Sequence, residues 1–252
     1  MKGLTWLSDA EWARIEPLLP RGRRGAHRVD DRRVISGIVH MLRSGARWRD
    51  CPAAYGPYTT VYNRFNRWSR QGLWFALFEA LTGHSGIYGL AAIDSTHIKA
   101  HRSATGGKGG PFEQALGKSR GGCTSKLHAL TDAKGRPRVL ILTAGNINDI
   151  TVAASLLERA GPVRRLVADR AYDADHLRRR LAEQCAEAII PSTTSRRKPI
   201  PYNKRAYKAR NRIERMWCRI KDWRRIATRY DKLARNYLSG AYLAAIFACW
   251  LN

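Results

Sequence analysis

Two aspartates, Asp94 and Asp169, occupy equivalent places in two apolar runs. The segments Tyr88–Asp94 and Val163–Asp169 are short and apolar, each ends in an acid, and each predicts a buried strand. The carboxyl ends of strands in open α/β sheets are where sites form. Carboxylates held close together repel each other, and a divalent cation is the usual remedy. The pair therefore indicates a shared anionic centre if the two strands are neighbours.

A third acid, Glu214, lies in a basic segment, 207–227, that predicts one long helix. At 100° per residue, Tyr207, Arg210, Glu214 and Lys221 project within about 60° of one another. The spacing alone leaves two interpretations open. Glu214 either joins the two aspartates as a third acid, or forms an ordinary intrahelical ion pair with Arg210 or Lys221.

Other polar residues near these acids favour structural roles. Asp149 is expected to cap a helix over 151–159, and Asp173 and Asp175 are expected to begin the helix that follows Asp169. His97 follows Asp94 closely, and we expect it to be packed or solvated rather than a metal ligand or a DNA contact.

The elements that must position the acids fall into two regions. Residues 1–82 predict three short helices, of which the third begins near Thr59 and carries Arg64 and Arg67 outward. Such an arrangement suits a helix-turn-helix reader of DNA, and the alternative is a helical bundle with a solvated basic face. From residue 86 onward the pattern predicts strand, hairpin, helix, strand, helix, strand and helix, which is a mixed α/β domain over 86–252. We expect a mobile loop at 103–122, a loop at 192–206 and a core-packing helix at 237–251.

The charge indicates an anionic partner. The chain of 252 residues has 46 Lys and Arg against 20 Asp and Glu, a net charge of +26. Residues 192–236 hold 16 of the basic and 3 of the acidic side chains, so half of the net charge lies there. Nucleic acid is the leading partner for such a chain, and Arg196, Arg197 and Lys198 are candidate contacts. A solvated face, or a ribosomal or RNA-binding role, would also fit charge alone.

The five cysteines have no C-x-x-C spacing, which argues against a zinc knuckle or a disulfide framework. No N-terminal segment resembles a signal peptide, and the apolar tail is shorter than the roughly 20 residues of a membrane span. We therefore expect a cytoplasmic, nucleoid-associated protein that does not contact membranes.

The motifs around the three acids resemble those of a known family. Tyr207, Arg210, Glu214 and Lys221 match the Tyr-Arg-Glu-Lys signature of bacterial insertion-sequence transposases, and the match is closest to the insertion-sequence-five type. Ile93-Asp94-Ser95-Thr96 and Asp169-Arg170-Ala171-Tyr172-Asp173 resemble the regions of that family's first and second acids. The resemblance runs over nearly the whole chain. Ala171 stands where many relatives have Gly, and the short gap between Asp169 and Glu214 excludes a large β-rich insertion.

The resemblance implies an RNase-H-like fold and an Asp-Asp-Glu triad of Asp94, Asp169 and Glu214. It implies two divalent ions, Mg²⁺ with Mn²⁺ as a substitute, and cleavage and transfer of DNA strands. Tyr207, Arg210 and Lys221 would contact phosphates near the cut end. The partners would be duplex DNA, as terminal inverted repeats and target, and a second copy of the chain in a dimer.

Two alternatives keep part of this interpretation. An inactive transposase could serve as a DNA-binding regulator, and a structural nucleic-acid-binding protein such as an RNA chaperone would explain the charge. Metal-dependent cleavage distinguishes the enzyme from both alternatives, and specific binding to repeat ends distinguishes the regulator from the chaperone.

Overall fold

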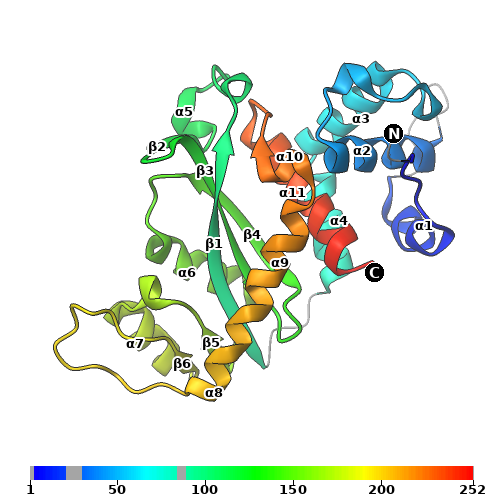
Figure 1. Ribbon diagram of the computed structural model, residues 1–252. Helices are drawn as coiled ribbons and strands as arrows, with labels where there is room; N and C mark the ends of the chain where they lie inside the picture. Colours follow the sequence, from blue (N-terminus) through cyan, green and yellow to red (C-terminus); the bar gives the residue numbers. More distant parts are fainter. Residues whose placement is uncertain (1–2, 21–29, 84–88, 252) are drawn as a thin grey trace.

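The computed structural model describes residues 3–20, 30–83 and 89–251 (Figure 1). The first part is helical, with short 3-10 turns at Glu16–Leu18, Trp48–Asp50 and Ala53–Tyr55. Its four helices are α1 (Asp9–Ile15), α2 (Asp31–Ser44), α3 (Tyr58–Arg70) and α4 (Leu73–Thr82). The sequence predicted three helices, and α4 is the addition. Gly72, in the left-handed conformation, separates α4 from α3, so the apolar run after it forms a helix of its own.

Local signals set the ends of the first two helices. Ser8 and Glu11 form a reciprocal capping box at the start of α1, as the serine followed by acids predicted. Asp30 caps α2 by accepting from the backbone N–H groups of Arg32 and Arg33. Gly45, with φ of 75°, ends α2 in the left-handed conformation that glycine adopts most readily.

A mixed sheet forms the centre of the second part, in the order β2-β3-β1-β5-β6. β1 is antiparallel to β3, which also pairs with β4 and β2, whereas β5 and β7 run parallel to β1 and β6 runs parallel to β5. Three long antiparallel strands followed by parallel strands confirm the RNase-H-like α/β fold. The strands are β1 (Leu90–Ala100), β2 (Gly117–Ser119), β3 (Gly122–Thr131), β4 (Pro137–Ala144), β5 (Arg165–Val167), β6 (Glu187–Ile189) and β7 (Thr228–Arg229).

Helices cover both faces of this sheet (Figure 1). One face packs against α6 (Asp149–Ala160) and α7 (Asp175–Glu183), and the other packs against α9 (Asn211–Lys221) and α11 (Ala234–Cys249). The short helices are α5 (Gly110–Glu113), α8 (Lys204–Tyr207) and α10 (Arg224–Ala227).

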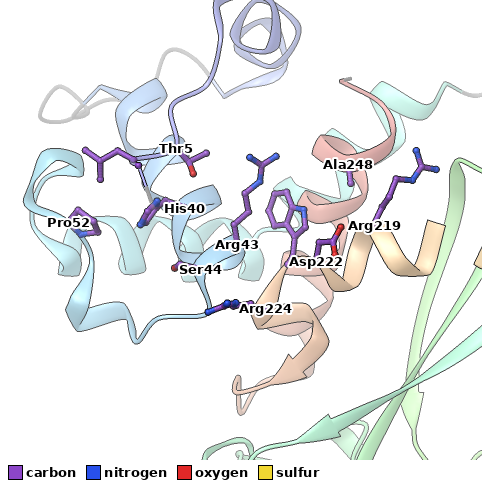
Figure 2. Close-up of a pocket in the computed structure, with 12 residues that line it drawn as sticks. Thr5, His40, Arg43, Ser44, Pro52, Arg219, Asp222, Arg224 and Ala248 are labelled. Carbon is purple, nitrogen blue, oxygen red and sulfur yellow. The ribbon is translucent and has the colours of Figure 1, made fainter. Parts of the chain in front are cut away.

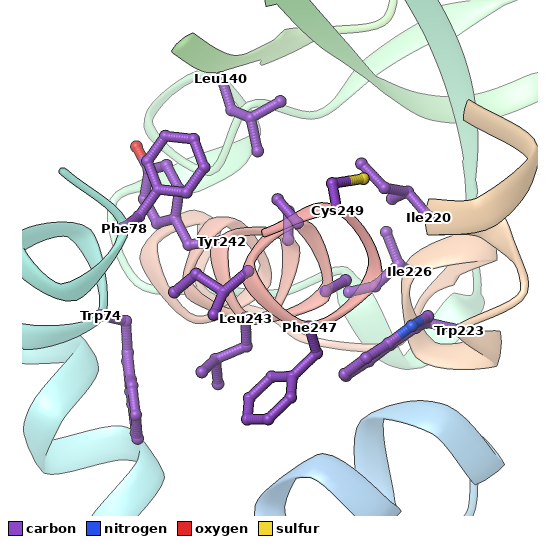
Figure 3. Packing of buried hydrophobic residues seen from close by; sticks show 14 of the residues in the cluster. Trp74, Phe78, Leu140, Ile220, Trp223, Ile226, Tyr242, Leu243, Phe247 and Cys249 are labelled. Atoms are coloured by element: carbon purple, nitrogen blue, oxygen red, sulfur yellow. The ribbon is translucent and has the colours of Figure 1, made fainter. Parts of the chain in front are cut away.

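The helix α11 joins the two parts of the chain. Tyr242 and Phe247 lie on it, and Figure 3 shows their rings among Phe78 of α4, Leu140 of β4 and Trp223 beside α10. One buried cluster therefore reaches from the helical part into the sheet, and the expected core-packing role of the apolar tail is confirmed. The division at residues 82 and 86 stays a prediction, and residue 86 lies outside the described ranges. No helix in those ranges combines the length and hydropathy that a bilayer-spanning segment requires.

The structure corrects three expected boundaries. β1 does not end at Asp94, because pairing with β3 and β7 continues the strand to Ala100; the expected start at Tyr88 falls outside the described residues. The helix expected over 207–227 is interrupted by a 3-10 turn at Lys208–Arg210 and by Trp223, whose extended backbone turns its side chain into the core. The segment 103–122 carries α5 and β2, because the Gln114 side chain bonds to the backbone of Lys108 and Ala234.

Candidate active site

The strand register brings Asp94 and Asp169 to the same level of the sheet. Ala92 of β1 pairs with Val167 of β5, and each aspartate follows its strand partner by two residues. Residues two apart on a strand share a face. Asp169 has already left β5, and its Oδ1 accepts a hydrogen bond from the N–H of Ala171 at 2.8 Å, which fixes the turn after the strand. The predicted proximity of the two acids therefore has a geometric basis in the sheet.

The Arg210 guanidinium lies among all three predicted acids. Its Nη1 is 2.6 Å from Oε1 of Glu214, and its Nη2 is 3.9 Å from Oδ1 of Asp94 and 4.0 Å from Oδ2 of Asp169. Glu214 thus forms the i,i+4 pair with Arg210 that spacing allowed, and it also faces the two aspartates. The ion pair with Arg210 and a position beside the two aspartates are therefore compatible for Glu214.

Burial shapes the electrostatics of this cluster. The Asp94 side chain is 13% exposed, and this burial, helped by the charge of Asp169, raises its pKa to about 6. Arg210, the N–H of Ser95 and the Trp217 indole act in the opposite direction. The acids therefore carry a charge that Arg210 offsets only in part. In the described ranges, no three acidic, His or Cys side chains form a ready-made metal site, so a cation would have to draw the carboxylates together.

The other signature residues lie at different distances from the acids. Tyr207 is half-buried and packs edge-on against Tyr202, with ring centroids 5.5 Å apart. Burial raises the pKa of Tyr207, and the charge of Arg210 opposes this rise only in part. Lys221 is at the far end of α9, seven positions after Glu214, which is about 10 Å along a helix axis. Their DNA contacts remain predictions.

A second polar cluster lies on the opposite face of the sheet and escaped prediction. Because Ser95 pairs with His128 while Asp94 pairs with Ala129, the His128 side chain points away from the acids. Its Nε2 is 2.9 Å from Oγ1 of Thr143, and burial lowers its pKa to about 4.

The Asp149 side chain joins this cluster and does not cap α6. The N-cap of α6 is Asn148, without a side-chain cap bond, and Asp149 is the first residue of the helix. The carboxylate pairs with buried Lys126 at 2.9 Å and lies 3.9 Å from the His128 ring. Lys126 and His128 are two residues apart on β3, so the sequence could indicate that both side chains share one face of the strand, but not that Asp149 is their partner. The expected side-chain cap is wrong because the carboxylate neutralises a buried lysine instead.

Two of the residues predicted to contact DNA, Arg64 and Arg196, form ion pairs within the protein. Arg64, expected to face outward, is 7% exposed, forms an ion pair with Asp31 and lies over the Trp68 ring. Its expected outward position is wrong because the buried guanidinium bridges α3 and α2. Arg67 is exposed on α3, as predicted.

In the loop after β6, Arg196 binds Asp173 through two hydrogen bonds of 2.9 and 3.1 Å and reaches Asp175 at 2.7 Å. Its neighbours Arg197 and Lys198 are exposed. Asp175 begins α7 as expected, whereas Asp173 lies before its N-cap, fully buried, and anchors the loop.

The acids do not line the cavity shown in Figure 2. That cavity, of about 1020 Å³, lies between the N-terminal segment, α2 and the end of α9. Arg43 stacks over the Trp223 ring there, at 4.9 Å from its centroid.

Comparison with known proteins decides the family. The transposase DDE domain family matches residues 86–248, and the family described as a putative transposase of the IS4/5 family matches residues 7–78. The chain belongs to the DDE transposases. The putative transposase of insertion sequence element IS6501 from Brucella ovis is 36% identical to this transposase over 130 residues, which cover 51% of this chain and 99% of the relative.

Further matches include a curated protein and two solved structures. An uncharacterized protein, y4sN, from Sinorhizobium fredii is 35% identical over 43% of this chain and 90% of its own length. The piggyBac transposase synaptic complex with hairpin DNA matches with a TM-score of 0.39 and 13% identity over 76% of this transposase and 48% of that chain, so the match spans about half of piggyBac. The Mos1 strand transfer complex matches with a TM-score of 0.28 and 12% identity, over 80% and 82% of the two chains. Both structures are too distant to place any residue.

Proposed function

We propose that this DDE transposase cleaves and joins DNA strands at a metal-dependent site held by Asp94, Asp169 and Glu214. The observation that carries the proposal is the convergence of three acids, from two neighbouring strands and a helix, on the one guanidinium of Arg210. An ordinary helical ion pair needs one acid, and the other two here add repulsion that a structural site would avoid.

The donor set fits a hard divalent cation. Carboxylate oxygens suit Mg²⁺ and Mn²⁺, and burial of Asp94 beside Asp169 leaves negative charge that a cation would offset. When bound, two such ions would activate the attacking hydroxyl and stabilise the leaving oxygen of an in-line displacement at phosphorus. Asp94, Asp169 and Glu214 would hold the ions. Arg210, released from the acids, would contact a phosphate beside the cut, with Tyr207 and Lys221 on the same strand.

The substrate of this site would be duplex DNA. We propose that the chain binds the terminal inverted repeats of its own element and a target duplex, in the bacterial cytoplasm and nucleoid. The net charge of +26 and the exposed Arg67, Arg197 and Lys198 support phosphate contacts along a long path. Two ends must be cut and joined together, so the active form would be a dimer on DNA.

Cleavage of a labelled duplex that carries the element's end tests this proposal. In Mg²⁺ or Mn²⁺ the wild type should cut, and EDTA should abolish cutting. Asp94→Asn, Asp169→Asn and Glu214→Gln should each lower the rate by at least about a hundredfold while they still bind the duplex.

The matched control is Glu183→Gln, because Glu183 is an exposed acid at the end of α7, and it should cut like the wild type. Full activity in any triad variant removes that residue from the site. Tight binding without cutting by the wild type on paired ends would make the chain a DNA-binding regulator.

A further inference from the structure

A groove of about 620 Å³ lies between the helical part and the far end of β1. One side comes from the segment before α3 and from α3 itself, and the other from the turn after β1 and the residues around α10 and β7 (Figure 1). The residues that the argument uses are Trp48, Arg49, Tyr58, Lys108, Arg225 and Asn236. A volume between roughly 300 and 1000 Å³ is typical of sites for small organic groups.

Aromatic rings form one wall of this groove. Tyr58 is 45% exposed at the first turn of α3, and Trp48 packs against Tyr62 with centroids 5.4 Å apart. The Arg225 guanidinium lies 5.2 Å from the Trp48 ring and 5.6 Å from the Tyr230 ring. Of these rings Tyr58 is the exposed one, and an exposed ring beside cations is a surface on which an unpaired base stacks.

Positive charge surrounds these rings. Arg49, Lys108 and Lys232 are exposed on the groove, and among them Arg49 lies near enough to Asp50 to lower the pKa of that carboxyl. Arg225, by contrast, pairs with Asp231 at 3.4 Å. The groove thus combines a ring face with exposed cations. A nucleotide's base would stack on the ring, and its phosphate would contact the cations.

Three buried polar atoms of groove residues lack hydrogen-bond partners within the described ranges. They are Nε1 of Trp48, Nε of Arg225 and Oδ1 of Asn236. Asn236 and Arg225 are only 3% and 5% exposed. Arg225 still donates to the carbonyl of Ala46, and Asn236 donates to Oδ1 of Asn66, so both side chains are held in place. The three open atoms are shielded from solvent, so the contacts with a ligand in the groove fall on its exposed groups.

We propose that this groove holds one or two unpaired nucleotides of the DNA strand that the chain processes. This inference rests on the proposed function. The groove lies near Ala100, and six residues of β1 separate it from Asp94, a span of roughly 20 Å. That span equals about six base pairs of B-DNA. Paired bases in a duplex hide their faces, whereas an unpaired base offers one to Tyr58.

The test compares two DNA probes of the same sequence. One is a blunt duplex, and the other ends in a three-nucleotide single-stranded overhang that contains 2-aminopurine. The wild type should bind the overhang probe about 10-fold more tightly than the blunt one, and stacking should quench the aminopurine fluorescence. Tyr58→Ala and Lys108→Ala should lose the preference, and Tyr58→Ala should lose the quenching. Tyr58→Phe keeps the ring and should retain both.

Controls separate this inference from the function on which it rests. Phe112→Ala removes an aromatic that is 85% exposed and does not line the groove, and Lys134→Ala removes an exposed cation of the hairpin turn; both should behave like the wild type. An unchanged preference and quenching in Tyr58→Ala would overturn the proposal. Equal weakening of both probes would also overturn it and would make the groove a duplex contact. Failure of the wild type to bind either probe would instead contradict the proposed function.

Discussion

Asp94 and His128 lie on opposite faces of the sheet, and burial shifts their pKa values in opposite directions. The pKa of Asp94 is raised to about 6 and that of His128 is lowered to about 4, so burial favours the neutral form of each. Asp94 keeps a cation beside it in Arg210, whereas His128 has Thr143 and, further away, Asp149. At the scale of residues, the acid face is the one that we propose to bind a cation, whereas the other face holds a neutral histidine beside the paired charges of Lys126 and Asp149.

Protonation of His128 should therefore weaken the fold in acid. With a folded pKa of about 4 and an ordinary value of 6.5, the unfolded chain takes up this proton first. The contribution is present above pH 6.5 and is lost as the pH falls toward 4, by up to about 3 kcal/mol. Urea unfolding at pH 7.5 and pH 5 should show a smaller loss of stability for His128→Gln than for the wild type.

The control for this measurement is His176→Gln, because His176 is an exposed histidine of α7 and is not among the groups that shift the pKa of His128. It should lose as much stability as the wild type between the two pH values. Equal losses in His128→Gln and the wild type would mean that His128 is not held neutral by the fold.

At the scale of elements, the loop after β6 bears on the position of Arg210, because it leads directly into α8 and the turn that carries Arg210. Asp173 ties that loop down: its Oδ2 accepts from the N–H of Thr193 at 2.8 Å, and its oxygens also bind Arg178 and Arg196. Burial alone would raise the pKa of Asp173, but the hydrogen bond from Arg196 leads the contacts that lower it to about 2. The carboxylate therefore stays charged across the working pH range.

Asp173→Asn should release this loop. Removing one partner from a buried ion-paired network costs about 2–4 kcal/mol, and the basic residues at 196–198 should be cut by trypsin at least about tenfold faster. Asp175→Asn is the matched control, because Asp175 contacts the same Arg196 but its side chain is 73% exposed. Its effect should stay below about 1 kcal/mol. Equal trypsin rates for Asp173→Asn and the wild type would show that other contacts fix the loop.

Local signals explain which elements the sequence predicts. The cap at Ser8, the turn at Asp132 and the apolar run before Asp169 act over a few residues, and the structure confirms the helix, hairpin and strand expected there. The continuation of β1 past Asp94 depends on β3 and β7, which are distant in sequence. The Lys126–Asp149 pair likewise forms only when α6 packs on β3, so no local pattern could reveal it.

At the scale of the whole molecule, one core carries both the acids and the surfaces that we propose to contact DNA. α11 packs against α4, α3 and β4, so the helical part is held on the sheet by buried apolar contacts rather than by a linker alone. The proposed nucleotide groove then lies at a fixed distance from the acids along β1. We expect DNA to be held across both parts, with its cut site at the carboxylates.

Binding of Mn²⁺ to the full chain, measured by calorimetry without DNA, tests the central claim most directly. Glu183→Gln should bind the ion like the wild type, because Glu183 is exposed and remote from the acids. Asp94→Asn and Glu214→Gln each remove a charged oxygen of the proposed metal site, and each should weaken binding by at least about tenfold. Unchanged Mn²⁺ affinity in both triad variants would contradict a metal site at Asp94, Asp169 and Glu214.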